Sequence, residues 1–224
     1  MGAEVTGPQP FPKYGVREDM AAGATLERDA ELMLRVREGD AESFALLLER
    51  HRGPVVHFLY RMLQNQAVAE ELAQEVFLRV YRSRSTYEPA AKFTTWLFRI
   101  ATHLALNGLR DGRKEKGHQS LGTDQEKGPV LEVADRAPSI EQRLVLDARL
   151  NEVRIAIQEL PDKQRAAVLM HKYEELDYSQ IAAVIGCSES AVKSLLFRAY
   201  EKLRESLGHM ASANATRGGR ANRG

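Results

Sequence analysis

Cysteine is nearly absent from the sequence, which has Cys187 alone among its 224 residues. A single cysteine excludes an internal disulfide framework and is typical of a protein in a reducing compartment. Long apolar runs are absent as well, and no stretch is long enough to span a bilayer. The N-terminus lacks the basic start and apolar core of a signal peptide. We therefore expect a cytoplasmic protein without membrane insertion.

Metal-ligating side chains are too scattered to form a site. The six histidines include no HExxH pair or similar cluster, and Cys187 has no histidine or cysteine partner at ligand spacing. An enzyme that acts on nucleic acid would need clustered carboxylates or metal ligands, and the sequence contains no such cluster. We expect no catalytic residue, no metal and no cofactor.

Net charge is also close to zero, with 32 basic and 31 acidic residues and a formal charge of +1. Any role in binding nucleic acid must therefore come from a local patch. One basic patch lies between residues 79 and 116, where acidic residues are few. Its basic members are Arg79, Arg82, Arg84, Lys92, Arg99, Arg110, Arg113, Lys114 and Lys116.

Apolar residues recur at helical spacing, and no stretch has the alternation of a β-strand. The periodic stretches fall at 28–112 and 139–208, with Ser139 and Gln142 fitting a capping box at the start of the second. Between them, residues 113–138 are polar and rich in glycine. This pattern predicts an all-α fold of two helical domains joined by a flexible linker. We expect a flexible arm at 1–27 and a disordered tail at 209–224.

The stretch DYSQIAAVIGCSESAVKSLLFRAYEKL, Asp177 to Leu203, predicts a helix-turn-helix. Such a motif needs a small residue on the first helix, a turn former and an apolar inner face on the second helix. Ala182, Gly186, Val192 and Leu195 have these properties at the expected offsets. Asp177 and Gln180 could cap the first helix, and Ser188 the second.

The outer face of the second helix could then enter a major groove. It presents Glu189, Ser190, Lys193, Ser194, Phe197 and Arg198. The alternative is a plain helical hairpin with a solvated charged face. Four matching offsets favour the DNA-binding interpretation.

The stretch AEELAQEVFLRVY predicts an amphipathic helix with an acidic, amide-bearing outer stripe. That stripe includes Glu70, Glu71, Gln74, Glu75 and Leu78. Carboxylates beside exposed apolar groups suit docking on a basic partner surface. An ordinary solvated face fits this segment equally well.

The stretch FTTWLFRIATHLALNGLR predicts a helix with a second DNA-binding face. Trp96, Leu97, Ile100 and Leu104 share the apolar side, where we expect Trp96 to pack in the core. The opposite side carries Arg99, His103, Asn107 and Arg110, so phosphate-binding and base-reading groups share one face. Tyr87, Phe93 and Thr94, from the adjoining loop, are groups able to stack on an unpaired base.

In their order, AEELAQEVFLRVY, KFTTWLFRIATHLALNGLR and LPDKQRAAVLMHKYEELDYSQIAAVIGCSESAVKSLLFRAYEKLRE resemble the signature of bacterial RNA polymerase sigma factors of the extracytoplasmic-function (ECF) group. The resemblance covers about Asp29 to Leu207. Three motifs in one order with a linker between them are highly specific, whereas any one alone would not be. The group keeps two helical domains, here region 2 at 28–112 and region 4 at 139–208.

The resemblance implies a role for each surface. The polymerase-binding residues would be Glu71, Gln74, Glu75 and Leu78, docked on the clamp helices of the largest polymerase subunit. The residues that recognise and melt the -10 promoter element would be Tyr87, Lys92, Thr94, Arg99, His103, Asn107 and Arg110. The loop from Ser85 to Lys92 is similar to one that holds a flipped non-template base. The residues that read the -35 element would be Ser190, Lys193, Ser194, Phe197 and Arg198. His171 and Lys172 fall near a position where some members of the group contact phosphate.

Some residues depart from the family pattern. His103 stands where the family often has asparagine, and Asn107 where it has aspartate, which leaves the -10 preference open. Gln180 replaces the usual glutamate and can still act as a cap. The resemblance also leaves open whether an anti-sigma factor or the C-terminal tail regulates the chain.

A second interpretation is a stand-alone two-domain transcriptional regulator that binds its operator as a dimer without polymerase. The acidic helix followed by the basic TTWL helix favours the first interpretation.

Overall fold

The computed structural model describes residues 19–89, 92–116 and 140–218, and the side chains within 28–89, 92–113 and 146–209. The described residues form helices and no strands, so the predicted all-α fold is confirmed. The expected capping box of Ser139 and Gln142 lies outside the described side chains. Most of the expected linker also lies outside the described residues, although α4 extends through its first residues.

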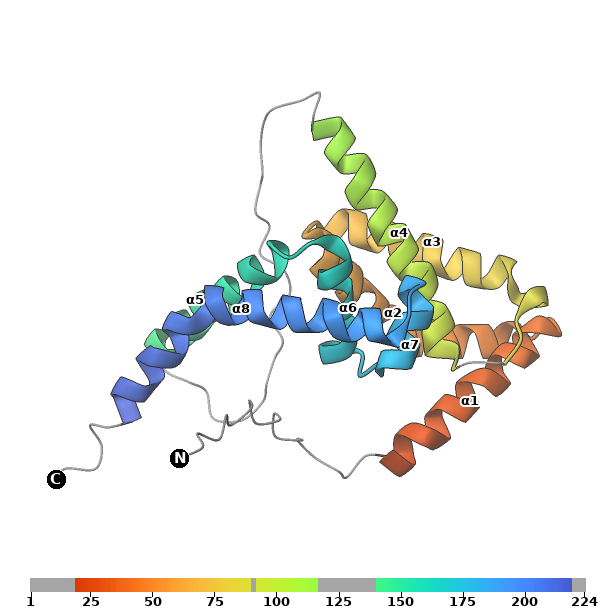
Figure 1. Ribbon diagram of the computed structural model, residues 1–224. Coiled ribbons are helices and arrows are strands. Elements are labelled where there is room, and N and C mark those ends of the chain that lie inside the picture. Colours follow the sequence, from red (N-terminus) through yellow and green to blue (C-terminus); the bar gives the residue numbers. More distant parts are fainter. Residues whose placement is uncertain (1–18, 90–91, 117–139, 219–224) are drawn as a thin grey trace, which may run out of the picture.

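The N-terminal lobe consists of α1 (Asp19–Arg37), α2 (Ala41–Leu63), α3 (Gln66–Arg82), the short 3-10 helix η1 (Arg84–Thr86) and α4 (Phe93–Lys116). Figure 1 shows α2, α3 and α4 packed side by side, with α1 across one end. Asp40 caps α2 by accepting from the backbone N–H groups of Glu42 and Ser43, and Asn65 caps α3 in the same way. Pro54 lies inside α2, which continues through it from Ala41 to Leu63.

Helix α1 is fixed to α2 by a buried carboxylate. Asp29 is 1% exposed, pairs with Arg50, and lies with one oxygen 2.8 Å from His51 Nε2. Leu32, Met33 and Val36 follow on the same helix and are buried in the core. An uncompensated buried charge is costly, so the two partners on α2 keep the middle of α1 in place.

The C-terminal lobe consists of α5 (Ile140–Gln158), α6 (Asp162–Tyr173), α7 (Tyr178–Ile185) and α8 (Glu189–Gly218). The predicted capping of the helix-turn-helix is confirmed. Asp177 accepts from Gln180 N–H at 2.9 Å, and the Gln180 side chain accepts from Asp177 N–H at 2.9 Å. Ser188 Oγ accepts from Ala191 N–H at 3.2 Å at the start of α8. Gly186 ends α7 with φ of +74°, a conformation that glycine adopts without a steric penalty.

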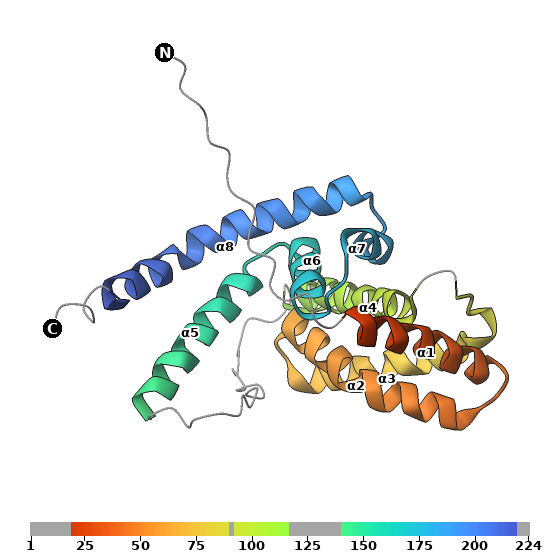
Figure 2. The ribbon, with the colours of Figure 1, turned by 90° about the horizontal axis from the view of Figure 1, so that it is seen from below.

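The two lobes share one continuous apolar core. Helix α7 packs on α4, and α6 packs on the end of α2. Figure 2 shows α6 and α7 seated against the N-terminal lobe, with α8 extending away from it. The sequence predicted two domains with a linker and did not predict this contact between them.

Two helices extend into segments expected to be irregular. Helix α1 begins at Asp19, inside the expected arm, and α8 continues to Gly218, inside the expected tail. Both extensions are rich in alanine and free of proline, and alanine has the highest helix propensity. The lack of periodicity in the arm and the low-complexity composition of the tail had suggested irregular chain.

Among the described residues, no single helix is both long and apolar enough to cross a membrane.

Candidate nucleic-acid interface

The first candidate surface is the outer face of α8. Lys193, Ser194 and Arg198 are exposed, and Phe197 is 65% exposed despite its apolar ring. Ser190 is exposed as well, and its carbonyl accepts from Ser194 Oγ at 3.1 Å. The opposite face is buried through Val192, Leu196 and Ala199, with Leu195 half-buried. The helix is therefore anchored on one side and leaves the predicted reading residues free on the other.

Aromatic contacts join α8 to α6 and α7 beneath this surface. Lys193 Nζ lies 6.0 Å from the centre of the Tyr178 ring, at the outer limit of a cation–π contact. His171 Nδ1 lies 3.0 Å from the Tyr200 hydroxyl, and its ring is tilted against Tyr178. His171 thus contributes to packing between α6, α7 and α8. Lys172 is exposed beside it.

The second candidate surface is the polar face of α4. Arg99, His103, Asn107 and Arg110 are all exposed, while Leu97 and Leu104 are buried. Trp96 is half-buried and packs against the core, as its position on the apolar face predicted. The face therefore combines cationic groups with an amide and an imidazole that can hydrogen-bond to base edges.

Tyr87 and Phe93 do not belong to that open surface. Tyr87 is 2% exposed and Phe93 0% exposed, and their rings pack with that of Trp96. Burial raises the pKa of the Tyr87 phenol, with a further increase from the negative charge of Asp29. In this conformation neither ring is free to stack on a base. Their sequence position beside a loop had suggested otherwise, because aromatic residues that anchor a loop resemble those that a loop presents.

Around this aromatic cluster, other residues of the predicted -10 set remain accessible. Lys92 is exposed and Thr94 is half-buried at the start of α4. Arg37 donates to the Tyr87 carbonyl at 3.4 Å and so ties the loop to α1. The structure therefore keeps Lys92 and Thr94 beside the polar face of α4 and places Tyr87 beneath it.

The third candidate surface is the outer side of α3. Glu71, Gln74 and Leu78 are exposed, and Leu78 is 42% exposed. Glu75 is half-buried and accepts from Arg79 Nε at 2.7 Å, one turn along the helix. This side of α3 therefore presents two carboxylates and an amide beside one exposed apolar side chain.

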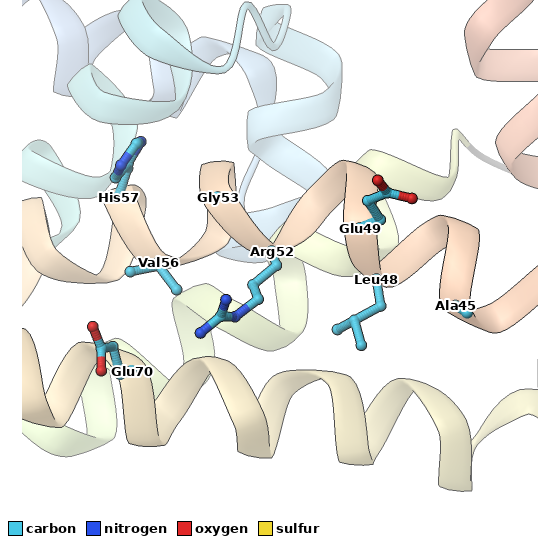
Figure 3. A pocket seen from close by; sticks show the side chains of 8 residues that line it. All are labelled: Ala45, Leu48, Glu49, Arg52, Gly53, Val56, His57 and Glu70. Atoms are coloured by element: carbon cyan, nitrogen blue, oxygen red, sulfur yellow. The ribbon is translucent and has the colours of Figure 1, made fainter. Parts of the chain in front are cut away.

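A shallow groove between α2 and α3 adjoins this surface. Figure 3 shows Arg52 and Glu49 on α2 above α3, with Glu70 on the facing helix. The floor of the groove is apolar through Leu48 and Val56. The sequence analysis did not single out the α2 side of this groove, although Leu48 and Arg52 are one turn apart and could have indicated it.

The contact between the lobes contains an unusual carboxyl group. Burial raises the pKa of Glu174, the residue after α6, to about 7, while the positive charge of Arg61 on α2 acts in the opposite direction. A carboxyl group with this pKa titrates within the physiological range.

Replacing Glu174 with glutamine is expected to stabilise the protein at neutral pH and to have little effect near pH 4. Because the folded protein holds the Glu174 proton more tightly than the unfolded chain, folded stability falls as the pH rises from about 4.5 to about 7. The difference in thermal unfolding midpoint between Glu174→Gln and the original protein should therefore grow across that window and then stay constant. Comparing the two proteins also removes the effects of His57 and His171, whose pKa values are lowered by burial. A difference in unfolding midpoint that does not change with pH would contradict the raised pKa of Glu174.

Comparison with known proteins matches one family model to each of these lobes. Residues 47–115 match the model of sigma-70 region 2, and residues 150–203 match that of sigma-70 region 4. The first range holds α3 and nearly all of α4, and the second holds the helix-turn-helix.

Curated relatives match over most of their length. The chain is 36% identical to the RNA polymerase sigma factor CarQ of Myxococcus xanthus, covering 80% of this chain and 97% of the relative. It is 30% identical to the ECF RNA polymerase sigma factor SigW of Bacillus subtilis, covering 77% of this chain and 93% of the relative.

Solved structures share the fold at lower identity. CnrH in complex with the cytosolic domain of CnrY matches with a TM-score of 0.59 and 20% identity, over 81% of this chain and 98% of that one. The sigma factor RpoE of Bartonella quintana, in complex with the anti-sigma factor NepR, matches with a TM-score of 0.59 and 20% identity. That match covers 75% of this chain and 98% of the RpoE chain.

Proposed function

This chain belongs to the ECF group of RNA polymerase sigma factors, and from that premise we propose which of its surfaces binds which partner. As a sigma factor it binds core RNA polymerase and directs promoter-specific transcription initiation. The proposal concerns the residues of the three exposed surfaces on α3, α4 and α8.

The outer face of α8 reads the -35 element in the major groove. Lys193 and Arg198 contact phosphates or guanine edges, Ser190 and Ser194 adapt to either base or backbone, and Phe197 meets a thymine methyl group. The observation that carries this assignment is that all five side chains are exposed on one face of the second helix of a capped helix-turn-helix, whose opposite face is buried.

The polar face of α4 recognises the -10 element and holds it open. Arg99 and Arg110 hold the strand backbone, while His103 and Asn107 meet base edges. Lys92 and Thr94 extend the same surface toward the loop. Unpairing costs a few kcal/mol, which contacts to the exposed single strand help to offset. Tyr87 supports this surface from beneath, and its direct contact with a base would require the loop to move.

The outer side of α3 docks on the clamp helices of the polymerase largest subunit. Glu71, Gln74 and Glu75 supply acceptors for a basic partner, and Leu78 supplies apolar contact area. The chemistry of RNA synthesis belongs to the polymerase, so we assign this chain no enzymatic activity, cofactor or metal. Its place of action is the bacterial cytoplasm, where core polymerase meets DNA.

Two measurements test the function. The purified protein should bind bacterial core RNA polymerase tightly, and the complex should start run-off transcripts at specific promoters. Without polymerase, the protein should bind duplex promoter DNA poorly. Failure to bind polymerase together with tight stand-alone binding to a duplex operator would make it a conventional helix-turn-helix regulator.

Replacing Glu75 with lysine is expected to weaken binding to core polymerase by about tenfold or more. The change removes an acceptor and places a cation opposite a basic surface, and like charges at an interface cost several kcal/mol. Titration of labelled sigma factor with core polymerase measures the loss. Arg79→Ala is the matched control, because it breaks the same pair on α3 but keeps the Glu75 carboxylate. Equal affinity of Glu75→Lys and the original protein would remove α3 from the docking surface.

A further inference from the structure

A pocket of about 310 Å³ lies beside the end of α2. Helix α2 supplies one wall of the pocket, and α5 and α6 supply the others. Small-molecule sites have volumes of about 300–1,000 Å³ and are lined mainly by apolar side chains, with a few polar groups that orient the ligand. The apolar lining here consists of Leu150, Val153 and Ile157 from α5, and Leu169 and Tyr173 from α6. The pocket therefore has the size and the lining of a site for a small ligand.

Two of these apolar side chains remain open to solvent. Leu150 is 56% exposed and Tyr173 is 43% exposed. Single exposed apolar residues are common on protein surfaces, but these two border the same pocket. A ligand with an apolar body would remove this surface from water, which is the main favourable contribution to binding in such a pocket.

Two arginines give the pocket a positive charge. Arg61 from α2 and Arg154 from α5 line it, and none of the described residues that line it is an aspartate or a glutamate. The Arg61 guanidinium lies 4.0 Å from the centre of the Tyr173 ring. Arg154 donates to two neutral partners, the Tyr60 hydroxyl at 3.4 Å and Asn151 Oδ1 at 2.6 Å. Within the part of the chain whose side chains are described, neither guanidinium forms an ion pair with a carboxylate.

Two titratable groups beside Arg61 are affected by its positive charge. The pKa of His57, which also lines the pocket, is held below its usual value by burial and by the charge of Arg61. Glu174 is outside the lining, and burial raises its pKa to about 7 despite the charge of Arg61. Near neutral pH about half of the Glu174 side chains are therefore uncharged. This carboxyl group neutralises Arg61 only in part.

From the apolar lining and the two unpaired guanidinium groups, we infer that this pocket binds a small amphipathic carboxylate. The carboxylate of the ligand pairs with Arg61 and Arg154, because a planar guanidinium can bind a carboxylate through two parallel hydrogen bonds. The apolar body of the ligand covers Leu150 and Ile157. At about 30 Å³ per water-sized group, the pocket holds about ten non-hydrogen atoms, the size of octanoate. None of the residues assigned to the surfaces on α3, α4 and α8 lines the pocket, so this site goes beyond the proposed function.

Calorimetric titration of the full-length protein with octanoate tests the site. Three further probes separate the parts of the recognition: 1-octanol keeps the chain without the charge, octylamine reverses the charge, and acetate keeps the carboxylate without the chain. Octanoate should bind with one-to-one stoichiometry and a Kd below about 1 mM, at least about tenfold more tightly than any of the three. Absence of octanoate binding, or equal binding of any of the other probes, would overturn the inference.

Substitutions at Leu150 test where octanoate binds, and they spare the core because this side chain is exposed. Leu150→Glu places a negative charge in the pocket and should weaken octanoate binding at least about tenfold. Leu150→Lys removes the same apolar side chain and should weaken binding less. Leu146→Glu is the matched control, because Leu146 is 52% exposed on the same helix and does not line the pocket. Its affinity for octanoate should equal that of the original protein.

Substitutions at Arg154 test the contact with the carboxylate. Arg154→Ala should weaken octanoate binding at least about tenfold, and Arg154→Lys, which keeps the charge but loses the planar head, should lie between alanine and arginine. Equal octanoate affinity of Leu150→Glu and Leu146→Glu, or of Arg154→Ala and the original protein, would overturn the inference. These titrations use the free protein, so their outcome does not depend on whether it binds polymerase.

Discussion

Replacing Arg165 with alanine is expected to lower the free energy of unfolding by about 3–5 kcal/mol, counting the volume removed and the buried carbonyl groups left without a donor. Arg165 is 6% exposed, and its guanidinium donates to four backbone carbonyls. Three of them, those of Ile157, Gln158 and Leu160, form the corner between α5 and α6. The fourth is the Met62 carbonyl of the other lobe, at 2.9 Å.

Two milder substitutions separate the causes of the loss. Arg165→Met keeps much of the volume and removes every donor, whereas Arg165→Lys keeps the charge but loses the planar, multiply donating head. We expect the order of stability to be arginine, lysine, methionine, alanine. Chemical unfolding followed by helical content gives the order, and hydrogen exchange in α5 and α6 locates the effect. An Arg165→Ala protein as stable as the original would show that the four carbonyls find water in place of the guanidinium.

Replacing Lys193 and Arg198 together with alanine is expected to abolish initiation that depends on the -35 element while leaving polymerase binding intact. Each side chain is exposed on the outer face of α8, where a good contact to a base contributes about 1–3 kcal/mol of discrimination. Each single variant should therefore lose about 5- to 150-fold in promoter affinity, measured with the polymerase complex on duplex promoters. Arg204→Ala, farther along the same helix, is the matched control.

The salt and sequence dependence of that loss distinguishes the two kinds of contact. A side chain that binds phosphate weakens all promoters alike and reduces the salt dependence when removed. A side chain that reads a base weakens only promoters that carry that base. Unchanged promoter output from both single variants would remove α8 from the -35 interface.

Features encoded within one or two helical turns could be predicted from the sequence. The capping box of Asp177 and Gln180, the positive φ of Gly186 and the buried Val192 all follow from spacing within the helix-turn-helix. The two faces of α4 were also predictable, since helical periodicity alone separates Arg99 and His103 from Leu97 and Leu104.

Features that depend on long-range contacts could not be predicted. A charged residue such as Arg165 reads as a surface residue, and only the converging carbonyls of α2, α5 and α6 explain its burial. Tyr87 was assigned to an open surface because nothing in its own segment reveals the packing of Phe93 and Trp96 around it. The contact between the lobes joins segments about 100 residues apart, as in the bond from Gln158 to Arg61, and no local pattern encodes it.

Helix α1 has a consequence for how the N-terminal lobe is isolated as a fragment. The family match begins at residue 47, but the buried pairing of Asp29 with Arg50 and His51 lies across that boundary. A fragment cut at residue 47 would lose Leu32, Met33 and Val36 from its core and expose apolar surface to solvent. A fragment meant to keep this core should therefore include Asp29, and the matched region is shorter than the unit that folds.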